Sequence, residues 1–336
     1  MTVDPDRATS RERTVQNVDP SLPWCCPECH APARLDGGLL SCGAGHQFGS
    51  ADGVLSLCGE GNYADSFGLE WLRYARTQVD KYNGTTISRD RLFSITRWPR
   101  DLRDERVLEA GSGSGRYTQV LLDAGARTVS FDYSAAVLAN LRNNGGHPNL
   151  TLFRGDIFNI PFTPESFDRV VCIGVIQHTP DPERAFQSLV RMLRPGGELA
   201  VDVYRLAPVS VLHPKYYLRP LRRLIPQAKL LNFARRAVPL LLPIKAALRK
   251  IPLAGVPLAH LLVPVPDYRG RLPLTDEQCR EWSELDLFDG LSPEHDHPVV
   301  RRQIERWVQE AGLVDVTIEL QSKGAQFTVR GRKALR

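Results

Sequence analysis

The sequence predicts an α/β protein with a doubly wound, mostly parallel sheet. From Arg106 onwards, short β-branched runs alternate with amphipathic segments of helix length, which is the pattern of βαβ units. The first of these runs enters a glycine-rich turn that opens a helix, a connection typical of parallel sheets. The chain has 336 residues and 42% of them are hydrophobic, so it can bury a full core. A disordered or fibrous class is therefore excluded.

The sheet is predicted from its elements in chain order. We expect strands at 106–110, 128–132, 150–153, 169–173 and 198–203, with helices near 116–124, 134–143 and 183–193. The turn Arg194-Pro195-Gly196-Gly197, before the last of these strands, contains residues that stop a helix. A helix at 298–311 and an antiparallel pair of strands at 313–320 and 326–331 complete the sheet.

Composition divides the chain into five segments. Residues 1–20 are polar without an apolar period, and we expect a disordered lead-in there. Residues 21–60 concentrate Cys, Gly and His, and residues 61–203 carry the core of the sheet. Residues 204–297 are a helical insertion, basic and proline-rich in its first part, where we expect broken helices. Residues 298–336 return to the sheet.

Charge and cysteine usage narrow the cellular setting. The start of the chain is polar, and no run of about 18 apolar residues follows. Five of the seven cysteines lie in the first 58 residues and the other two are far apart, unlike the framework of a small secreted domain. We therefore expect a cytoplasmic protein. The net charge is +5, but Val203–Pro266 contains 11 Lys and Arg and no Asp or Glu, so the positive charge is concentrated there.

The strongest local signal is a strand that runs into glycines 111, 113 and 115. Glycine lets the backbone turn tightly and approach a ligand, and the free N–H groups at a helix start favour an anionic group. A dinucleotide fingerprint would need glycine at Arg116, so the spacing here is G-x-G-x-G after the acidic Glu109. This spacing argues against a nicotinamide dinucleotide site.

Carboxylates follow the next two strands. Asp132 ends the second strand, where a carboxylate can accept hydrogen bonds from both hydroxyls of a ribose. Asp156 and Ile157 follow the third strand and could meet the edge of an adenine ring. The alternative is that Glu109 and Asp132 are only carboxylates at strand ends and that the glycines form only a turn.

In order and spacing, these motifs resemble the class I S-adenosylmethionine-dependent methyltransferases. The resemblance implies a seven-stranded sheet with a reversed last strand. It also implies that Glu109, Gly111 and Gly113 line the methionine part of S-adenosylmethionine, that Asp132 binds its ribose, and that Asp156 and Ile157 bind its adenine. The other positions expected to line the cofactor are Ser112, Gly115, Tyr133, Ile173 and Gly174.

Methyl transfer needs an aligned nucleophile and sometimes a base, because the sulfonium already supplies an electrophilic methyl group. His178 lies just past the fourth strand, where the crevice of such sheets opens, and is the candidate general base. The alternative is that His178 only packs or orients its loop. Cys172 lies inside an apolar strand and is expected to be a core residue.

The front of the chain carries a metal-binding pattern. Cys26, Cys29, Cys42 and His46 have the spacing C-x2-C-x12-C-x3-H, which suits tetrahedral Zn²⁺. The segment resembles the zinc ribbon that precedes the catalytic domain of bacterial ribosomal-RNA guanine methyltransferases. The neighbouring Cys25 and His30 could replace one of these ligands.

Four further segments resemble a bacterial methyltransferase subgroup that is often encoded with sugar, glycan or natural-product pathways. They are residues 67–71, 77–82, 215–220 and 286–293. That resemblance favours a small-molecule, glycan or lipid-linked glycan acceptor. The expected acceptor-pocket residues are Tyr82, Asp289, His295 and His297, although the last three could equally form a solvated loop.

The acid-free segment leaves three interpretations open. Its basic and apolar residues, within 215–250, could bind an anionic membrane surface, placing the protein at the inner face of the membrane. They could instead track RNA, which makes a ribosomal-RNA base methyltransferase the runner-up, or form only a lid over the pocket. No Asn-Pro-Pro-Tyr-like tetrapeptide follows the fourth strand, which disfavours methylation of exocyclic amines on bases. A non-catalytic scaffold is a third class, and the intact glycines and carboxylates argue against it.

Overall fold

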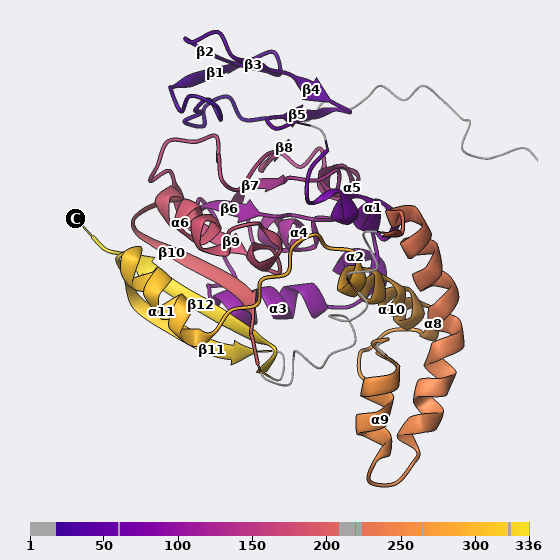
Figure 1. Ribbon diagram of the computed structural model, residues 1–336. Coiled ribbons are helices and arrows are strands. Elements are labelled where there is room, and N and C mark those ends of the chain that lie inside the picture. The colour runs from indigo at the N-terminus through magenta and orange to yellow at the C-terminus, as the bar shows by residue number, and fades with distance from the viewer. Residues whose placement is uncertain are drawn as a thin grey trace, which may run out of the picture.

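A nine-stranded sheet is the centre of the computed structural model, which describes residues 18–59, 61–207, 219, 224–263, 265–321 and 324–335. Most of the lead-in expected at 1–20 lies outside these residues, as do 208–218 and 220–223 of the insertion. The strand order is β11-β12-β10-β9-β6-β7-β8-β5-β4 (Figure 1).

Seven of these strands form the sheet that the sequence predicted. They are β6 (Arg106–Ala110), β7 (Arg127–Asp132), β8 (Leu150–Arg154), β9 (Phe167–Cys172), β10 (Leu193–Tyr204), β11 (Leu313–Gln321) and β12 (Gln326–Lys333). The pairs from β8 to β10 are parallel, whereas β12 is antiparallel to both of its neighbours. The reversed last strand is therefore confirmed. The Pro-Gly-Gly turn is drawn into β10, whose register shifts between Leu193 and Glu198.

Helices cover both faces of the sheet, because successive buried residues on a strand point to opposite sides. On one face α3 (Ile87–Thr96) and α4 (Arg116–Asp123) pack over Val107 and Val171. On the other, α6 (Pro182–Met192) and α11 (Arg301–Glu310) pack over Leu108 and Val170. The α5 helix (Val137–Asn144) packs through Val137 on Leu150 and Leu152 of β8. The doubly wound architecture is thus as expected.

The N-terminal segment is less separate than the sequence suggested. Strands β1 (Ala33–Asp36), β2 (Leu39–Cys42) and β3 (Gln47–Phe48) form a small antiparallel sheet. The following β4 (Ser50–Ala51) and β5 (Val54–Ser56) extend the main sheet, with Leu55 paired in parallel to Phe153 of β8. The main sheet therefore has nine strands rather than the expected seven, because this segment adds two at the β8 edge (Figure 1).

The insertion forms a projecting helical hairpin. The long helix α8 (Gln227–Arg249) runs past Pro239 and Pro243 without a break, where broken helices were expected. Its buried Leu230, Ala234, Val238 and Leu242 recur every four residues and pack in one cluster with residues of α10 (Asp276–Leu291). The shorter α9 (Gly255–Leu262) returns beside α8 (Figure 1). Among the described residues, no helix combines the length and apolar character needed to cross a membrane.

Candidate active site and metal centre

The glycine turn between β6 and α4 uses left-handed backbone that favours glycine. Gly111, Gly113 and Gly115 have φ values of 75°, 52° and 83°. A Cβ atom on Gly111 would lie 2.3 Å from Cγ2 of Val175, and one on Gly115 would lie 2.1 Å from Oδ1 of Asn140. Both the backbone conformation and the close packing therefore require glycine in this turn.

Three asparagines of α5 hold the turn from behind. The Nδ2 atom of Asn143 donates to the Ser114 carbonyl at 2.8 Å, and Nδ2 of Asn144 donates to the Gly115 carbonyl at 2.9 Å. Nδ2 of Asn140 donates to the Thr118 hydroxyl at 2.8 Å. Sequence reasoning missed these residues. Their spacing puts them on one face of the predicted helix, which was the available signal.

Asp132 lies at the carboxyl end of β7 and lines the cavity described below. Its Oδ2 accepts the Gly113 N–H at 2.9 Å, and its Oδ1 accepts the N–H and hydroxyl of Ser134 at 2.9 and 2.7 Å. Burial raises the pKa of Asp132, while these hydrogen bonds oppose the rise. A carboxylate offers about four lone-pair sites, so capacity remains for a ligand hydroxyl.

Three predicted cofactor residues lie behind the cavity wall. Glu109 is buried, and its carboxylate accepts the hydroxyls of Thr118 at 2.5 Å and Ser130 at 2.7 Å. Burial raises the pKa of Glu109 to about 7. Asp156 accepts the Phe158 N–H at 2.9 Å, and neither it, Glu109 nor Gly115 lines the cavity. In the structure the side chains of Glu109 and Asp156 bind neighbouring protein groups behind the wall.

A cavity of about 910 Å³ opens at the carboxyl ends of the parallel strands. One half is lined by predicted residues: Gly111, Ser112, Gly113, Asp132, Tyr133, Ile157, Ile173, Gly174 and His178. Side chains of other helices and of β10 line the other half, among them Glu70, Arg91, Tyr204, Lys245, Asp286 and Asp289. We call the part lined by the first group of residues the cofactor half and the part lined by the second group the acceptor half. This location follows the rule for open α/β sheets.

The four predicted acceptor residues are placed differently from one another. Asp289 lines the acceptor half. Tyr82 lies outside the cavity, 40% exposed, with the guanidinium of Arg76 over its ring. His295 and His297 stack at 5.5 Å between ring centroids, and His295 also contacts Tyr63, which lines the cavity. The histidines therefore form a layer behind the wall.

His178 lines the cavity with its orientation fixed on several sides. Its ring lies 5.1 Å from that of Phe67 and 5.5 Å from that of Tyr204. Its Nδ1 lies 3.0 Å from the carbonyl oxygen of His295. Because a carbonyl can only accept, Nδ1 must carry the proton of this bond, which leaves Nε2 of the neutral ring as a proton acceptor.

The acceptor half contains buried carboxylates that sequence reasoning missed. Glu70 on α1 (Asp65–Arg73) is 1% exposed, and its Oε2 has no hydrogen-bond partner among the residues that the structure describes. Burial, then the charges of Asp289 and Asp286, raise the pKa of Glu70. Burial likewise raises the pKa of Asp286 to about 7, although the Tyr268 hydroxyl donates to it. Such groups mark functional sites because a partner or a proton must neutralise them.

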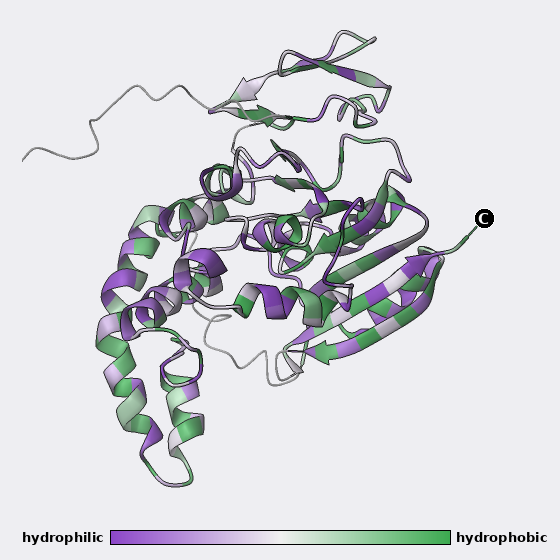
Figure 2. Cartoon of the chain, turned by 180° about the vertical axis from the view of Figure 1, so that it is seen from behind, coloured by the Kyte–Doolittle hydropathy of each residue, from purple (hydrophilic) through white to green (hydrophobic). Residues whose placement is uncertain are grey.

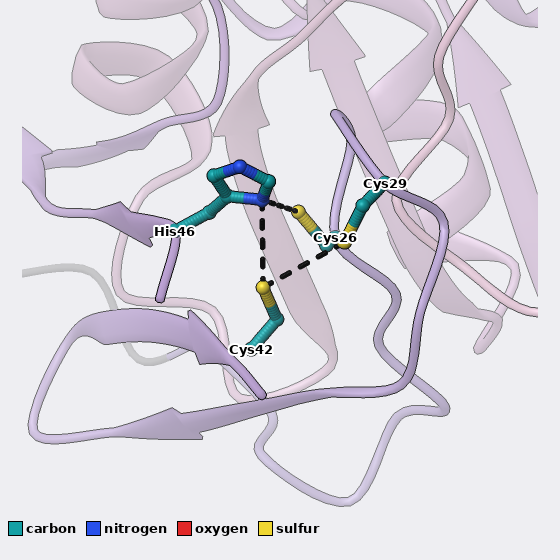
Figure 3. Close-up of side chains that lie close together, drawn as sticks. All are labelled: Cys26, Cys29, Cys42 and His46. Carbon is teal, nitrogen blue, oxygen red and sulfur yellow. Dashed lines mark hydrogen bonds between the residues drawn. The ribbon is translucent and has the colours of Figure 1, made fainter. Parts of the chain in front are cut away.

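The cysteine and histidine side chains at the front point toward one another (Figure 3). The Nδ1 atom of His46 lies 3.4 Å from Sγ of Cys26 and 3.6 Å from Sγ of Cys42, and the Sγ atoms of Cys29 and Cys42 lie 3.7 Å apart. A tetrahedron around Zn²⁺ with bonds of about 2.0–2.3 Å has edges of about 3.5–3.8 Å. The donor set and its dimensions thus fit zinc.

The surroundings of this cluster agree with the same four ligands. Nε2 of His46 lies 3.3 Å from a carboxylate oxygen of Glu28, which is the contact that orients metal-binding histidines. Cys25 and His30 are outside the cluster, in which the four ligand atoms lie within 4.8 Å of one another. The Cys25 N–H instead donates to the Pro161 carbonyl at 2.9 Å.

The fold is an open α/β sheet with a ligand-sized cavity at the ends of its parallel strands. Comparison with known proteins indicates which family of such folds the domain resembles. Residues 108–201 match the family model of the methyltransferase domain. Over this domain the chain is similar to class I S-adenosylmethionine-dependent methyltransferases.

Curated relatives match less than half of this chain. A demethylmenaquinone methyltransferase of Clavibacter sepedonicus is 26% identical over 134 residues, covering 39% of this chain and 55% of that protein. One from Corynebacterium efficiens is 31% identical over 154 residues, covering 44% and 65%. The chain spans about half the length of the curated relatives it matches.

A solved structure similar to this chain is phosphoethanolamine N-methyltransferase 2 of Haemonchus contortus. It has a TM-score of 0.46 and 14% sequence identity, and the match covers 82% of this chain and 61% of that chain.

Proposed function

We propose that this protein transfers the methyl group of S-adenosylmethionine to a small-molecule, glycan or lipid-linked acceptor that carries hydroxyl or amino groups. One observation carries the proposal: a single cavity joins the glycine turn and Asp132 to a half lined by buried carboxylates. The names of the demethylmenaquinone methyltransferases also specify a small organic acceptor.

The residues of the cofactor half suit the proposed donor. When bound, S-adenosylmethionine supplies an electrophilic methyl group on a sulfonium. Asp132 would accept a ribose hydroxyl, and the hydroxyl of Ser112, which has no partner among the described residues, would bind a polar group of the amino-acid part. Ile157 offers an apolar contact for the adenine ring.

His178 would act as general base. Its Nε2 is the free acceptor of the ring, and the ring lines the same cavity as the glycine turn. A hydroxyl of the acceptor would lose its proton to Nε2 while its oxygen forms the bond to the methyl carbon. The carbon–sulfur bond would break at the same time and leave a neutral thioether.

Glu70, Asp286 and Asp289 would bind the acceptor. Their oxygens can accept hydrogen bonds from several hydroxyl or ammonium groups, and Oε2 of Glu70 has no partner in the described part of the chain. This group of hydrogen-bond acceptors supports a small acceptor that carries hydroxyl or amino groups.

Zinc would hold the N-terminal segment in place rather than take part in methyl transfer. All four ligand positions are filled by side chains, which is the closed arrangement of structural zinc sites. The cluster lies in the segment that supplies β4 and β5 to the main sheet.

The first experiment is calorimetric titration of the protein with S-adenosylmethionine, beside Asp132→Ala. Asp123→Ala is the matched control, because Asp123 is an exposed carboxylate at the end of α4. We expect saturable binding that only Asp132→Ala weakens, by about tenfold or more. The absence of binding by folded protein would contradict the proposal.

The second experiment screens hydroxylated and amine-bearing acceptors for methyl uptake. With an accepted compound, His178→Asn should lower kcat by about 10²-fold or more, with little change in S-adenosylmethionine affinity. Glu70→Gln should raise the acceptor KM. If His178→Asn retains full kcat across the pH range, the assignment of the base is wrong.

A further inference from the structure

Exposed apolar side chains are concentrated on the α8–α9 hairpin, residues 224–263. Among the described residues, eighteen large hydrophobic side chains are exposed, and ten of them lie here. These are Leu224, Ile225, Phe233, Leu240, Ile244, Ile251, Leu253, Val256, Leu261 and Leu262. Figure 2 shows hydrophobic residues along both helices where they project. A patch of this kind on a soluble domain marks an interaction surface.

The apolar residues are densest at the tip of the hairpin, where α8 ends and α9 begins. Leu253 in the connecting loop is fully exposed, Val256 in the first turn of α9 is more than half exposed, and Ile251 is 45% exposed. The tip lies at the far end of the projection from the main sheet (Figure 1). It can therefore contact a surface that the rest of the domain does not reach.

The positive charge of the hairpin indicates which kind of surface it would bind. Residues 203–266 contain no Asp or Glu, and exposed Lys229, Arg235 and Arg236 lie on α8, with exposed Lys250 directly after it. A symmetric contact with a second copy of the chain would bring this basic face against itself. An anionic bilayer offers negative headgroups to the basic residues and a hydrocarbon boundary to the apolar ones.

The hairpin also borders the cavity. Lys245 and Arg249 of α8 and His260 of α9 line its acceptor half. Nζ of Lys245 donates to the carbonyls of Val263 and Val265 at 2.9 and 2.5 Å, which ties α8 to the segment after α9. The hairpin is thus fixed to the wall of the site, and the cavity extends toward it.

We propose that the α8–α9 hairpin docks on an anionic membrane, with its tip, residues 251–256, inserted at the headgroup boundary and the basic residues of α8 on the lipid phosphates. The active-site cavity then opens beside the bilayer, where a lipid-linked acceptor is present. The docking is independent of methyl transfer, and only the delivery of such an acceptor depends on the proposed function.

The test is flotation of the full chain with vesicles of phosphatidylcholine alone or mixed with phosphatidylglycerol. We expect binding to the mixed vesicles that falls as salt rises, and little binding to phosphatidylcholine. Leu253→Glu/Val256→Glu should weaken binding by about tenfold or more. The matched control is Val314→Glu/Leu320→Glu, which places the same charges at exposed apolar positions of β11 and should leave binding unchanged.

A second variant tests the basic residues. Arg235→Gln/Arg236→Gln should reduce binding to the anionic vesicles by about tenfold, and raising the phosphatidylglycerol content should recover part of it. Calorimetric titration of each variant with S-adenosylmethionine separates the two proposals, because a docking defect should leave cofactor affinity intact.

Three results would overturn the docking proposal. The first is that folded wild-type protein fails to float with anionic vesicles. The second is a concentration-dependent dimer, seen by analytical ultracentrifugation, that Leu253→Glu/Val256→Glu abolishes, since the hairpin would then meet a second copy. The third is salt-sensitive retention of RNA under conditions in which the vesicles are not bound.

Discussion

Arg91 of α3 and Asp202 of β10 form an ion pair, with Nη2 of Arg91 2.8 Å from Oδ2 of Asp202. The other oxygen of Asp202, a residue only 1% exposed, accepts the Gly174 N–H at 2.5 Å. One carboxylate thus joins a helix of one layer, the central sheet and the loop after β9, which lines the cofactor half.

Removing this carboxylate is expected to destabilise the protein. Asp202→Ala removes the buried carboxylate that pairs with Arg91 and accepts the Gly174 N–H, and we expect a loss of about 3–5 kcal/mol in the free energy of unfolding. Chemical denaturation measures this loss. Asp101→Ala is the control, because Asp101 pairs with Arg103 at an exposed position and should change stability little. Similar losses in both variants would contradict the prediction.

The glycine turn offers a pair of substitutions matched in backbone conformation. Gly111→Ala meets both a φ of 75° and a Cβ contact of 2.3 Å with Val175, whereas Gly146→Ala meets a φ of 85° and nothing within 4 Å. Each should lose about 1–2 kcal/mol from backbone strain. Gly111→Ala should lose more, and should also weaken S-adenosylmethionine binding. Equal unfolding free energies for the two variants would show that Val175 moves aside without cost.

Stability is expected to fall as pH rises through neutrality, in part because of Asp286. Burial raises the pKa of this carboxyl from 3.8 to about 7, so folding favours its protonated form. The associated stability is present below pH 4 and is lost as pH rises through about 7, up to about 4 kcal/mol. Asp286→Asn should therefore narrow the difference in unfolding free energy between pH 5 and pH 8. An unchanged difference would mean that Asp286 is ionised at pH 5.

Zinc content should depend on the cluster residues alone. We expect about one zinc per chain by elemental analysis, lost in Cys42→Ser and retained in Cys58→Ser, since Cys58 lies outside the cluster. Loss of the metal should lower the melting temperature by several degrees, because the N-terminal segment packs on the core through Trp24 and Phe162, with ring centroids 4.5 Å apart. Zinc-free wild-type protein with an unchanged melting temperature would contradict this.

The sequence predicted the features that local patterns determine. The observed bounds of β6 to β9 agree with the predicted ranges to within two residues, because the alternation of β-branched runs and amphipathic segments is a local property of the sequence. The start of β10 was missed by five residues, since tertiary pairing with β9 extends the strand through a glycine turn. The glycine turn, Asp132 and the group of three cysteines and one histidine could also be singled out in the sequence, because each follows from spacing along the chain, and the structure brings the four Cys and His side chains together.

The acceptor half was largely missed for the opposite reason. Glu70 lies on α1, Arg91 on α3 and Asp286 on α10, and only the packing of these helices over the strand ends brings the side chains together. Glu70 and Asp286 are 216 positions apart in the sequence, and no local spacing indicates that both carboxylates will be buried in one cavity. Tyr82 illustrates the reverse error, since an aromatic residue in a plausible motif lies on the surface.

The pairing of Leu55 with Phe153 has a consequence for how the chain assembles. The β5 strand is synthesised about a hundred residues before the strand it completes, so this edge closes through a contact of long sequence separation, which slows folding. Until it closes, β8 presents unpaired N–H and C=O groups, a template for aggregation. A chain shortened to start after residue 60 would keep that edge open permanently, so such truncations should express as insoluble protein even though the methyltransferase domain is intact.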